Sequence, residues 1–215
     1  MQSLEKLNQK TKKAYDKAAQ KYYDSFYNEL DKKPFDKNFI DIFLSNLNSN
    51  SIICDAGCGP CGHLENYIFN KGFKITGIDI SERCIEIAQK HFPEIKFETG
   101  NFSNFNCNDN YFDGLISYYS IIDTPKIYID KILKEFNRVL KKNGFLLLVV
   151  KEGKGEGYQN ELLGIRTKIY FSHFSEKEIK TYLEANNFEI KKMQKRNPYP
   201  DEIKVNRIFS ISIKK

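Results

Sequence analysis

Residues Ile52 to Gly62 read Ile-Ile-Cys-Asp-Ala-Gly-Cys-Gly-Pro-Cys-Gly, and this stretch decides the fold class. An apolar run leads into an acid, three glycines follow, and a helical pattern begins at about His63. A strand, a glycine-rich loop and a helix in this order open a nucleotide-binding α/β unit. Such a loop needs glycine because its backbone approaches a ligand closely and adopts positive φ angles. The helix that follows points its free N–H groups at the ligand.

The rest of the chain alternates between strand-like and helix-like patterns, which predicts a parallel sheet with helices on both faces. Two amphipathic helices, at 3–30 and 35–47, precede the glycine loop. The expected strands are 51–55, 74–79, 95–99, 112–118, 144–151, 167–171, 188–195 and 204–213. The expected helices after the glycine loop are 63–71, 81–91, 126–140 and 175–186. Residues 151–158 hold three glycines at alternate positions, and we expect a loop without regular structure there.

Five segments in order resemble the motifs of the class I S-adenosylmethionine (SAM) methyltransferases. Asp55 to Gly62 is similar to their first motif, Asp/Glu-x-Gly-x-Gly-x-Gly, with Cys61 where a third glycine is common. Segments 74–80, 96–102, 112–117 and 136–148 resemble the later motifs, so the resemblance covers roughly residues 15–213.

The resemblance implies an α/β fold with a Rossmann-like, doubly wound, mostly parallel sheet of seven strands. It further implies a C-terminal antiparallel strand and an N-terminal helical cap. Residues 1–215 would form a single domain, in which 1–47 are the cap and 48–215 the Rossmann-like core.

The resemblance also implies SAM as the cofactor and S-adenosylhomocysteine as its product. Asp79 would then bind the ribose hydroxyls, Ile80 would lie against the adenine ring, and the Asn101 amide would hydrogen-bond the adenine edge. The residues expected to bind the cofactor are Tyr15, Tyr22, Asp55, Gly57, Cys58, Gly59, Asp79, Ile80, Asn101, Phe102, Ser117 and Tyr118.

The first helix carries Tyr15 and Tyr22 within Tyr-Asp-Lys-Ala-Ala-Gln-Lys-Tyr. In many small-molecule methyltransferases a similar helix folds over the cofactor. The two rings either contact SAM or the acceptor, or pack the helix onto the domain.

Two residues are candidates for catalysis, although methyl transfer depends mainly on positioning and needs a base only for a protonated acceptor. Asp123 stands near the position where related enzymes often carry a histidine base, but it could equally cap a helix that Pro125 begins. His173 lies on a segment that we expect to form the wall of the acceptor site.

Composition bounds the remaining function classes. The net charge of +6 comes from lysines spread along the chain among 28 acids, so a nucleic-acid surface is not favoured. No apolar run reaches the length of a membrane span, and no signal peptide is visible. Five cysteines form no even framework, which favours a cytoplasmic chain with free thiols. Cys58-x-x-Cys61 lacks a matching second pair, so we expect no metal.

The sequence therefore predicts a SAM-dependent methyltransferase acting on an oxygen or nitrogen of a small-molecule acceptor. An RNA or protein methyltransferase is the first alternative, on the ground of the basic charge. A nicotinamide-dependent oxidoreductase is the second, because Gly57 to Gly62 fits G-x-G-x-x-G. A SAM-binding protein without catalysis is the third. Monomer and homodimer both stay open.

Overall fold

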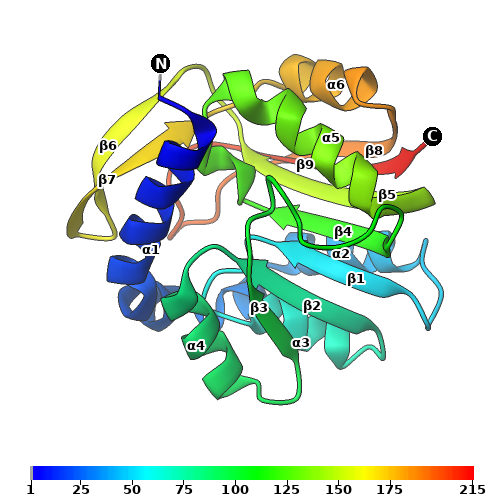
Figure 1. Ribbon diagram of the computed structural model, residues 1–215, viewed down its shortest axis with the longest axis horizontal. Coiled ribbons are helices and arrows are strands. Elements are labelled where there is room, and N and C mark those ends of the chain that lie inside the picture. The colour runs from blue at the N-terminus through cyan, green and yellow to red at the C-terminus, as the bar shows by residue number, and fades with distance from the viewer. Residues whose placement is uncertain (1) are drawn as a thin grey trace.

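A computed structural model describes residues 2–215 and shows one seven-stranded sheet with helices on both faces (Figure 1). The strand order is β3-β2-β1-β4-β5-β9-β8. The strands are β1 (Ile52–Ala56), β2 (Lys74–Asp79), β3 (Lys96–Thr99), β4 (Phe112–Tyr118), β5 (Leu140–Lys151), β8 (Phe188–Arg196) and β9 (Arg207–Lys214). The Rossmann-like fold predicted from the sequence is confirmed.

Parallel pairing runs from β3 through β2, β1 and β4 to β5, while β9 pairs antiparallel with both β5 and β8. The predicted C-terminal antiparallel strand is therefore β9, which is buried along most of its length. The strand order reverses between β1 and β4, because β2 and β3 lie on one side of β1 and the later strands on the other. Open α/β sheets bind ligands at the carboxyl ends of the strands at such a switch point.

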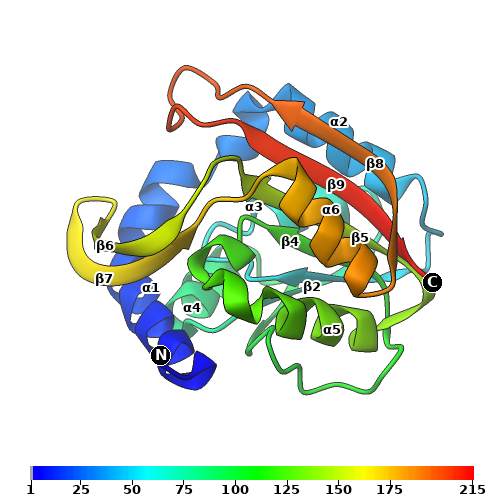
Figure 2. The ribbon, with the colours of Figure 1, turned by 90° about the horizontal axis from the view of Figure 1, so that it is seen from above.

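The helices form two layers over the sheet (Figure 2). The helices α2 (Pro34–Leu44), α3 (His63–Phe69) and α4 (Glu82–His91) contribute to one apolar cluster, which includes Phe39, Phe43 and Phe209. The helices α5 (Ile129–Val139) and α6 (Glu176–Ala185) contribute to the cluster on the other face, around Phe136 and Phe188. Both faces are covered, which is why the central strands carry branched apolar residues on both sides.

The helix α1 (Leu4–Phe26) lies outside these layers, next to α4 and to a hairpin of β6 (Glu156–Leu162) and β7 (Ile165–Ser172) (Figure 1). Its amphipathic stripe is buried at Leu4, Leu7, Ala14 and Ala18, as the periodicity predicts. It ends earlier than expected, and a 3₁₀ turn (Glu29–Lys32) joins it to α2. Because α2 packs in the same layer as α3, only α1 occupies a cap-like place; the division at residue 47 stays a prediction.

Two local expectations are wrong. Residues after 155 are not an irregular loop: β6 (Glu156–Leu162) pairs with β7 (Ile165–Ser172) in a separate antiparallel hairpin. The glycines hid this strand because β6 is largely exposed and carries no apolar alternation. The helix expected at 126–140 is divided into a 3₁₀ turn (Lys126–Tyr128) and α5. The helix expected at 175–186 is α6, and Ser175 and Glu178 form a capping box at its start.

No helix among residues 2–215 is both long and apolar enough to cross a membrane.

Gly62 and Gly72 offer a matched test of how the glycine loop packs. Both have positive φ angles, +61° and +87°, but a Cβ on Gly62 would lie 2.4 Å from a Phe92 ring carbon, whereas one on Gly72 would meet no atom within 4 Å. Gly72→Ala should therefore cost about 1–2 kcal/mol for the backbone angle alone. Gly62→Ala should cost about 1–3 kcal/mol more because the ring must move. Urea unfolding measures both, and equal losses would contradict the packing.

Candidate functional site

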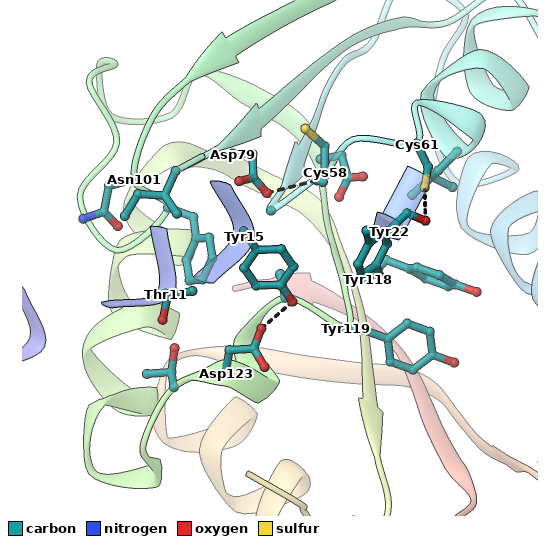
Figure 3. Close-up of a pocket in the computed structure, with 18 of the residues that line it drawn as sticks. Thr11, Tyr15, Tyr22, Cys58, Cys61, Asp79, Asn101, Tyr118, Tyr119 and Asp123 are labelled. Atoms are coloured by element: carbon teal, nitrogen blue, oxygen red, sulfur yellow. Dashed lines mark hydrogen bonds between the residues drawn. The ribbon is translucent and has the colours of Figure 1, made fainter. Parts of the chain in front are cut away.

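A pocket opens at the carboxyl ends of β1, β2 and β4, beneath α1 (Figure 3). The empty space within it, open solvent at its mouth included, amounts to about 930 Å³. Its wall includes most of the residues singled out from the sequence: Tyr15, Tyr22, Asp55, Gly57, Cys58, Gly59, Asp79, Ile80, Asn101, Phe102, Tyr118 and Asp123. Residues from four separate motifs thus meet at the switch point of the sheet.

The glycine loop is fixed by the backbone of the neighbouring strand. The N–H groups of Gly57 and Cys58 both donate to the carbonyl oxygen of Ile78, at 2.7 and 3.1 Å. A Cβ on Gly57 would lie 2.4 Å from Cβ of Ser120, so this glycine allows the close approach of two loops. Gly59 has a φ of +62° and no atom within 4 Å of its missing Cβ, so this part of the loop borders open space.

Asp79 joins three elements around the pocket. Its carboxylate accepts hydrogen bonds from the Gly59 N–H (3.0 Å) and the Ser81 N–H (2.8 Å). The Ser81 hydroxyl donates in turn to Asp16 on α1, at 2.7 Å. Burial raises the pKa of Asp79 to about 6, against the opposing effect of these hydrogen bonds. The glycine loop, β2 and α1 therefore depend on one buried carboxylate.

Asp123 faces the pocket and is bound to α1 through Tyr15 (Figure 3). The Tyr15 hydroxyl donates to Oδ2 of Asp123 at 2.6 Å. Burial raises the pKa of Asp123 to about 6, and burial together with Asp123 raises the pKa of Tyr15 well above its usual value. The shared proton thus belongs to the tyrosine. Asp123 lies in a 3₁₀ turn (Ile121–Asp123) and does not cap α5, so the capping interpretation is wrong.

A further buried carboxyl group, that of Glu65, was not predicted from the sequence to lie near the site. It lies on the first turn of α3 beside Asp55, and burial and this contact raise the pKa of Asp55 well above its usual value. Both side chains are almost fully buried, so the pair holds a proton in preference to two charges. An acid in the first turn of a helix is usually a solvated partner of the helix dipole, which is why Glu65 gave no signal.

Tyrosine rings form much of the remaining wall. Tyr118 is the last residue of β4 and Tyr119 follows it, with their ring centroids 4.5 Å apart, and Tyr119 has a φ of +59°. The Tyr118 hydroxyl donates to buried Asp36 at 2.5 Å. Arg196 on β8 lies 2.8 Å from both Asp36 and Glu202, so a buried ion-pair network supports these rings from behind. Tyr119, Glu29 and His63 also line the pocket and were not predicted as cofactor or catalytic residues.

Two predicted residues do not line the pocket. Ser117 is fully buried, and its hydroxyl lies 2.7 Å from that of Ser120, which does line it. His173 lies after β7, where its backbone N–H donates to Gly155 and its ring packs 5.4 Å from that of Phe171. Burial lowers the pKa of His173 below its usual value. The backbone around His173 forms hydrogen bonds that connect the hairpin to the end of β5 and the residues after it.

The cysteines show no disulfide partner: all five, including Cys58 and Cys61 of the loop, are free thiols. Within residues 2–215, no group of three or more His, Cys, Asp or Glu side chains is arranged to hold a metal ion.

Comparison with known proteins finds a family match for part of the chain. Residues 53–144 match the family described as methyltransferase domain. An uncharacterized methyltransferase of Oceanobacillus iheyensis is 29% identical over 100 residues, which are 46% of this chain and 46% of that protein. The chain thus spans about half the length of this curated relative.

Solved structures share the fold. A SAM-dependent methyltransferase of Methanosarcina mazei superposes with a TM-score of 0.73 at 23% identity, covering 80% of this chain and 96% of the other. The 1,6-didemethyltoxoflavin-N1-methyltransferase of Burkholderia thailandensis superposes with a TM-score of 0.78 at 17% identity, covering 100% and 92%.

Because the charge of Asp123 is buried, removing it should stabilise the fold, and the gain in the free energy of unfolding should depend on pH. Its pKa of about 6 in the folded chain exceeds the ordinary 3.8, so folding is penalised where the group is ionised, above about pH 6, and not below about pH 4. Asp123→Asn removes the charge but keeps an oxygen for the Tyr15 hydroxyl. It should raise the free energy of unfolding by roughly 1–3 kcal/mol at pH 8. The gain should fade towards pH 4.

Urea unfolding across this pH range measures the effect. Asp201→Asn, at an exposed residue of the turn between β8 and β9, is the control and should change little. A gain that is equal at both ends of the pH range would show that the Asp123 carboxylate is not held as a costly buried charge.

Proposed function

We propose that this chain is a class I SAM-dependent methyltransferase, which transfers the methyl group of SAM to a small-molecule acceptor held beneath α1. The observation that carries this proposal is the pocket itself. It lies at the switch point of the sheet, and the residues of the glycine loop, the ends of β2 and β4, and the loop after β3 all line it.

The wall of the pocket fits the cofactor. Gly59 borders open space where a backbone can approach a ligand, and the carboxylate of Asp79, which lines the pocket, can accept hydrogen bonds from ribose hydroxyls. Asp55 also lines the pocket, at the start of the glycine loop. Ile80, Asn101 and Phe102 stand on the side where adenine would lie.

The chain contributes position and shielding to the reaction. SAM supplies, when bound, a methyl group on a positively charged sulfur. Asp123 and Tyr15 face the same pocket and can orient an acceptor hydroxyl or amine. The carboxylate of Asp123 can also act as a base and take a proton from an acceptor that binds in its protonated form. Tyr15 keeps that carboxylate in place.

The cover over the pocket supports a small acceptor. Besides the bonds of Tyr15 and Asp16, α1 is attached through Asn8, whose amide donates to the Ser103 hydroxyl at 3.1 Å, and through Tyr23, whose ring stacks on His91. A nucleic acid or protein acceptor would need this helix to be displaced. We therefore extend the proposal to α1 as a cap that closes over bound ligand.

Binding of S-adenosylhomocysteine tests the cofactor. Asp79→Ala should weaken it by about tenfold or more, since charge-assisted hydrogen bonds contribute about 1.5–3 kcal/mol each. Calorimetry on the folded variant measures this, with Asp201→Ala as the control. Unchanged affinity would remove Asp79 from the site. Tight binding of NAD in place of S-adenosylhomocysteine would favour the oxidoreductase.

Hydrogen exchange tests the cap. On addition of S-adenosylhomocysteine, amides of α1 should exchange more slowly, because the helix gains a ligand surface beneath it. Amides of α6, which does not line the pocket, should be unaffected. Protection of α1 that does not change on binding would reduce the helix to a fixed structural element.

A further inference from the structure

We propose that the methyl acceptor is a small amine, which enters the pocket as a cation and is methylated on nitrogen. The inference deepens the proposed function and rests on it. It is carried by two features of the same pocket: the sign of the charges in its wall, and the tyrosine rings around Asp123.

The ionisable wall of the pocket is acidic. Glu29, Asp55, Asp79 and Asp123 line it, and no lysine or arginine does so within residues 2–215. The one basic side chain in the wall is His63, and burial lowers its pKa to about 4, so it is neutral at neutral pH. The nearby cations stand behind the wall.

Each of those cations either forms ion pairs with carboxylates or has its side chain outside the pocket. Lys33 pairs with Glu29 and with Glu202, so it offsets the charge of Glu29. Lys151 lies near Asp123 at the end of β5, but its side chain does not line the pocket. With Asp55 and Asp79 on the cofactor side, Asp123 remains the carboxylate that an acceptor meets.

Tyrosine rings line the same pocket as this carboxylate. The Tyr15 ring lies beside Asp123, with its centroid 6.0 Å from that of Tyr22, and Tyr118 and Tyr119 also line the pocket (Figure 3). The hydroxyls of Tyr15 and Tyr118 are occupied by Asp123 and Asp36. Ring faces attract cations, and the attraction grows when water is excluded. Rings beside a carboxylate favour an ammonium group.

An anionic acceptor does not suit this wall. A carboxylate or phosphate would lose its hydration and meet the carboxylates of Asp79 and Asp123 without a cation facing it in the pocket wall, which is strongly unfavourable. A neutral hydroxyl could bond to Asp123 but would gain nothing from the net negative field. The charge pattern therefore separates amines from the other acceptor classes.

The amine reaction balances with the groups present. A proton passes from the ammonium nitrogen to the Asp123 carboxylate and frees the nitrogen lone pair. That lone pair forms the bond to the methyl carbon as the carbon–sulfur bond breaks, and the electron pair of the broken bond stays on sulfur. The methylated nitrogen leaves as a cation, and Asp123 returns its proton to water.

Three probes of one shape test the inference on protein saturated with S-adenosylhomocysteine, whose sulfur is neutral. They are N,N-dimethylethanolamine, its uncharged isostere 3-methyl-1-butanol, and the anion 3-methylbutanoate. Calorimetry at neutral pH should show the amine binding about tenfold tighter than the alcohol, with the anion weakest. In Asp123→Asn the preference of amine over alcohol should fall to about twofold or less, while Asp201→Asn keeps it.

Each outcome bears on a separate claim. Equal binding of the three probes, absence of binding by all of them, or preference for the anion would overturn the amine assignment while leaving the methyltransferase intact. The comparison of probes on the unaltered chain does not depend on the folding of the variant. Failure of S-adenosylhomocysteine itself to bind would overturn the proposed function instead.

Discussion

The site depends on one constraint, the double hydrogen bond from the turn after β1 to the end of β2. The carbonyl of Ile78 accepts from both Gly57 and Cys58, and Asp79, the next residue, accepts from Gly59. Two strands are thereby joined at their carboxyl ends by the backbone of a loop that cannot carry side chains at Gly57. Because neighbouring parallel strands end at the same edge of the sheet, these hydrogen bonds also fix where the loop after β4 and the helix α1 can pack. The pocket is the space that remains between them.

Several carboxyl groups lie at this edge of the sheet, although their burial makes the folded chain less stable. Burial raises the pKa values of Asp55, Asp79 and Asp123, which means that each is costly as an anion in the folded chain. At Asp55 the neighbouring Glu65 adds to this effect, and at Asp123 the nearby Lys151 offsets it only in part. The buried arginines and Lys33 are engaged elsewhere, with Asp36, Glu29 and Glu202. Groups held at such cost in a cavity are typical of functional sites. A cationic cofactor or acceptor would restore the missing partner.

The sequence predicted the elements that local chemistry determines and missed those that tertiary contacts determine. Glycines at positive φ and the spacing to Asp79 are properties of one loop and one strand, so they could be read from residues 52–80. Glu65 is a first-turn acid by pattern, and only the packing of α3 against β1 buries it beside Asp55. His173 was expected in the acceptor wall from the position of its segment in the sequence. The pairing of β7 with β6 in a separate hairpin leaves it outside the pocket.

The network behind the tyrosines explains how a late segment of the chain can act on this site. Arg196 and Glu202 belong to β8 and the turn that follows it, far in sequence from Tyr118 and Asp36. The ion pairs close among themselves, so their charges largely cancel before they reach the pocket. What the network transmits is position: it holds the Tyr118 hydroxyl away from the cavity, at Asp36. The tyrosine rings therefore form the surface that a ligand meets. The electric field inside the pocket is set by the carboxylates of Asp79 and Asp123.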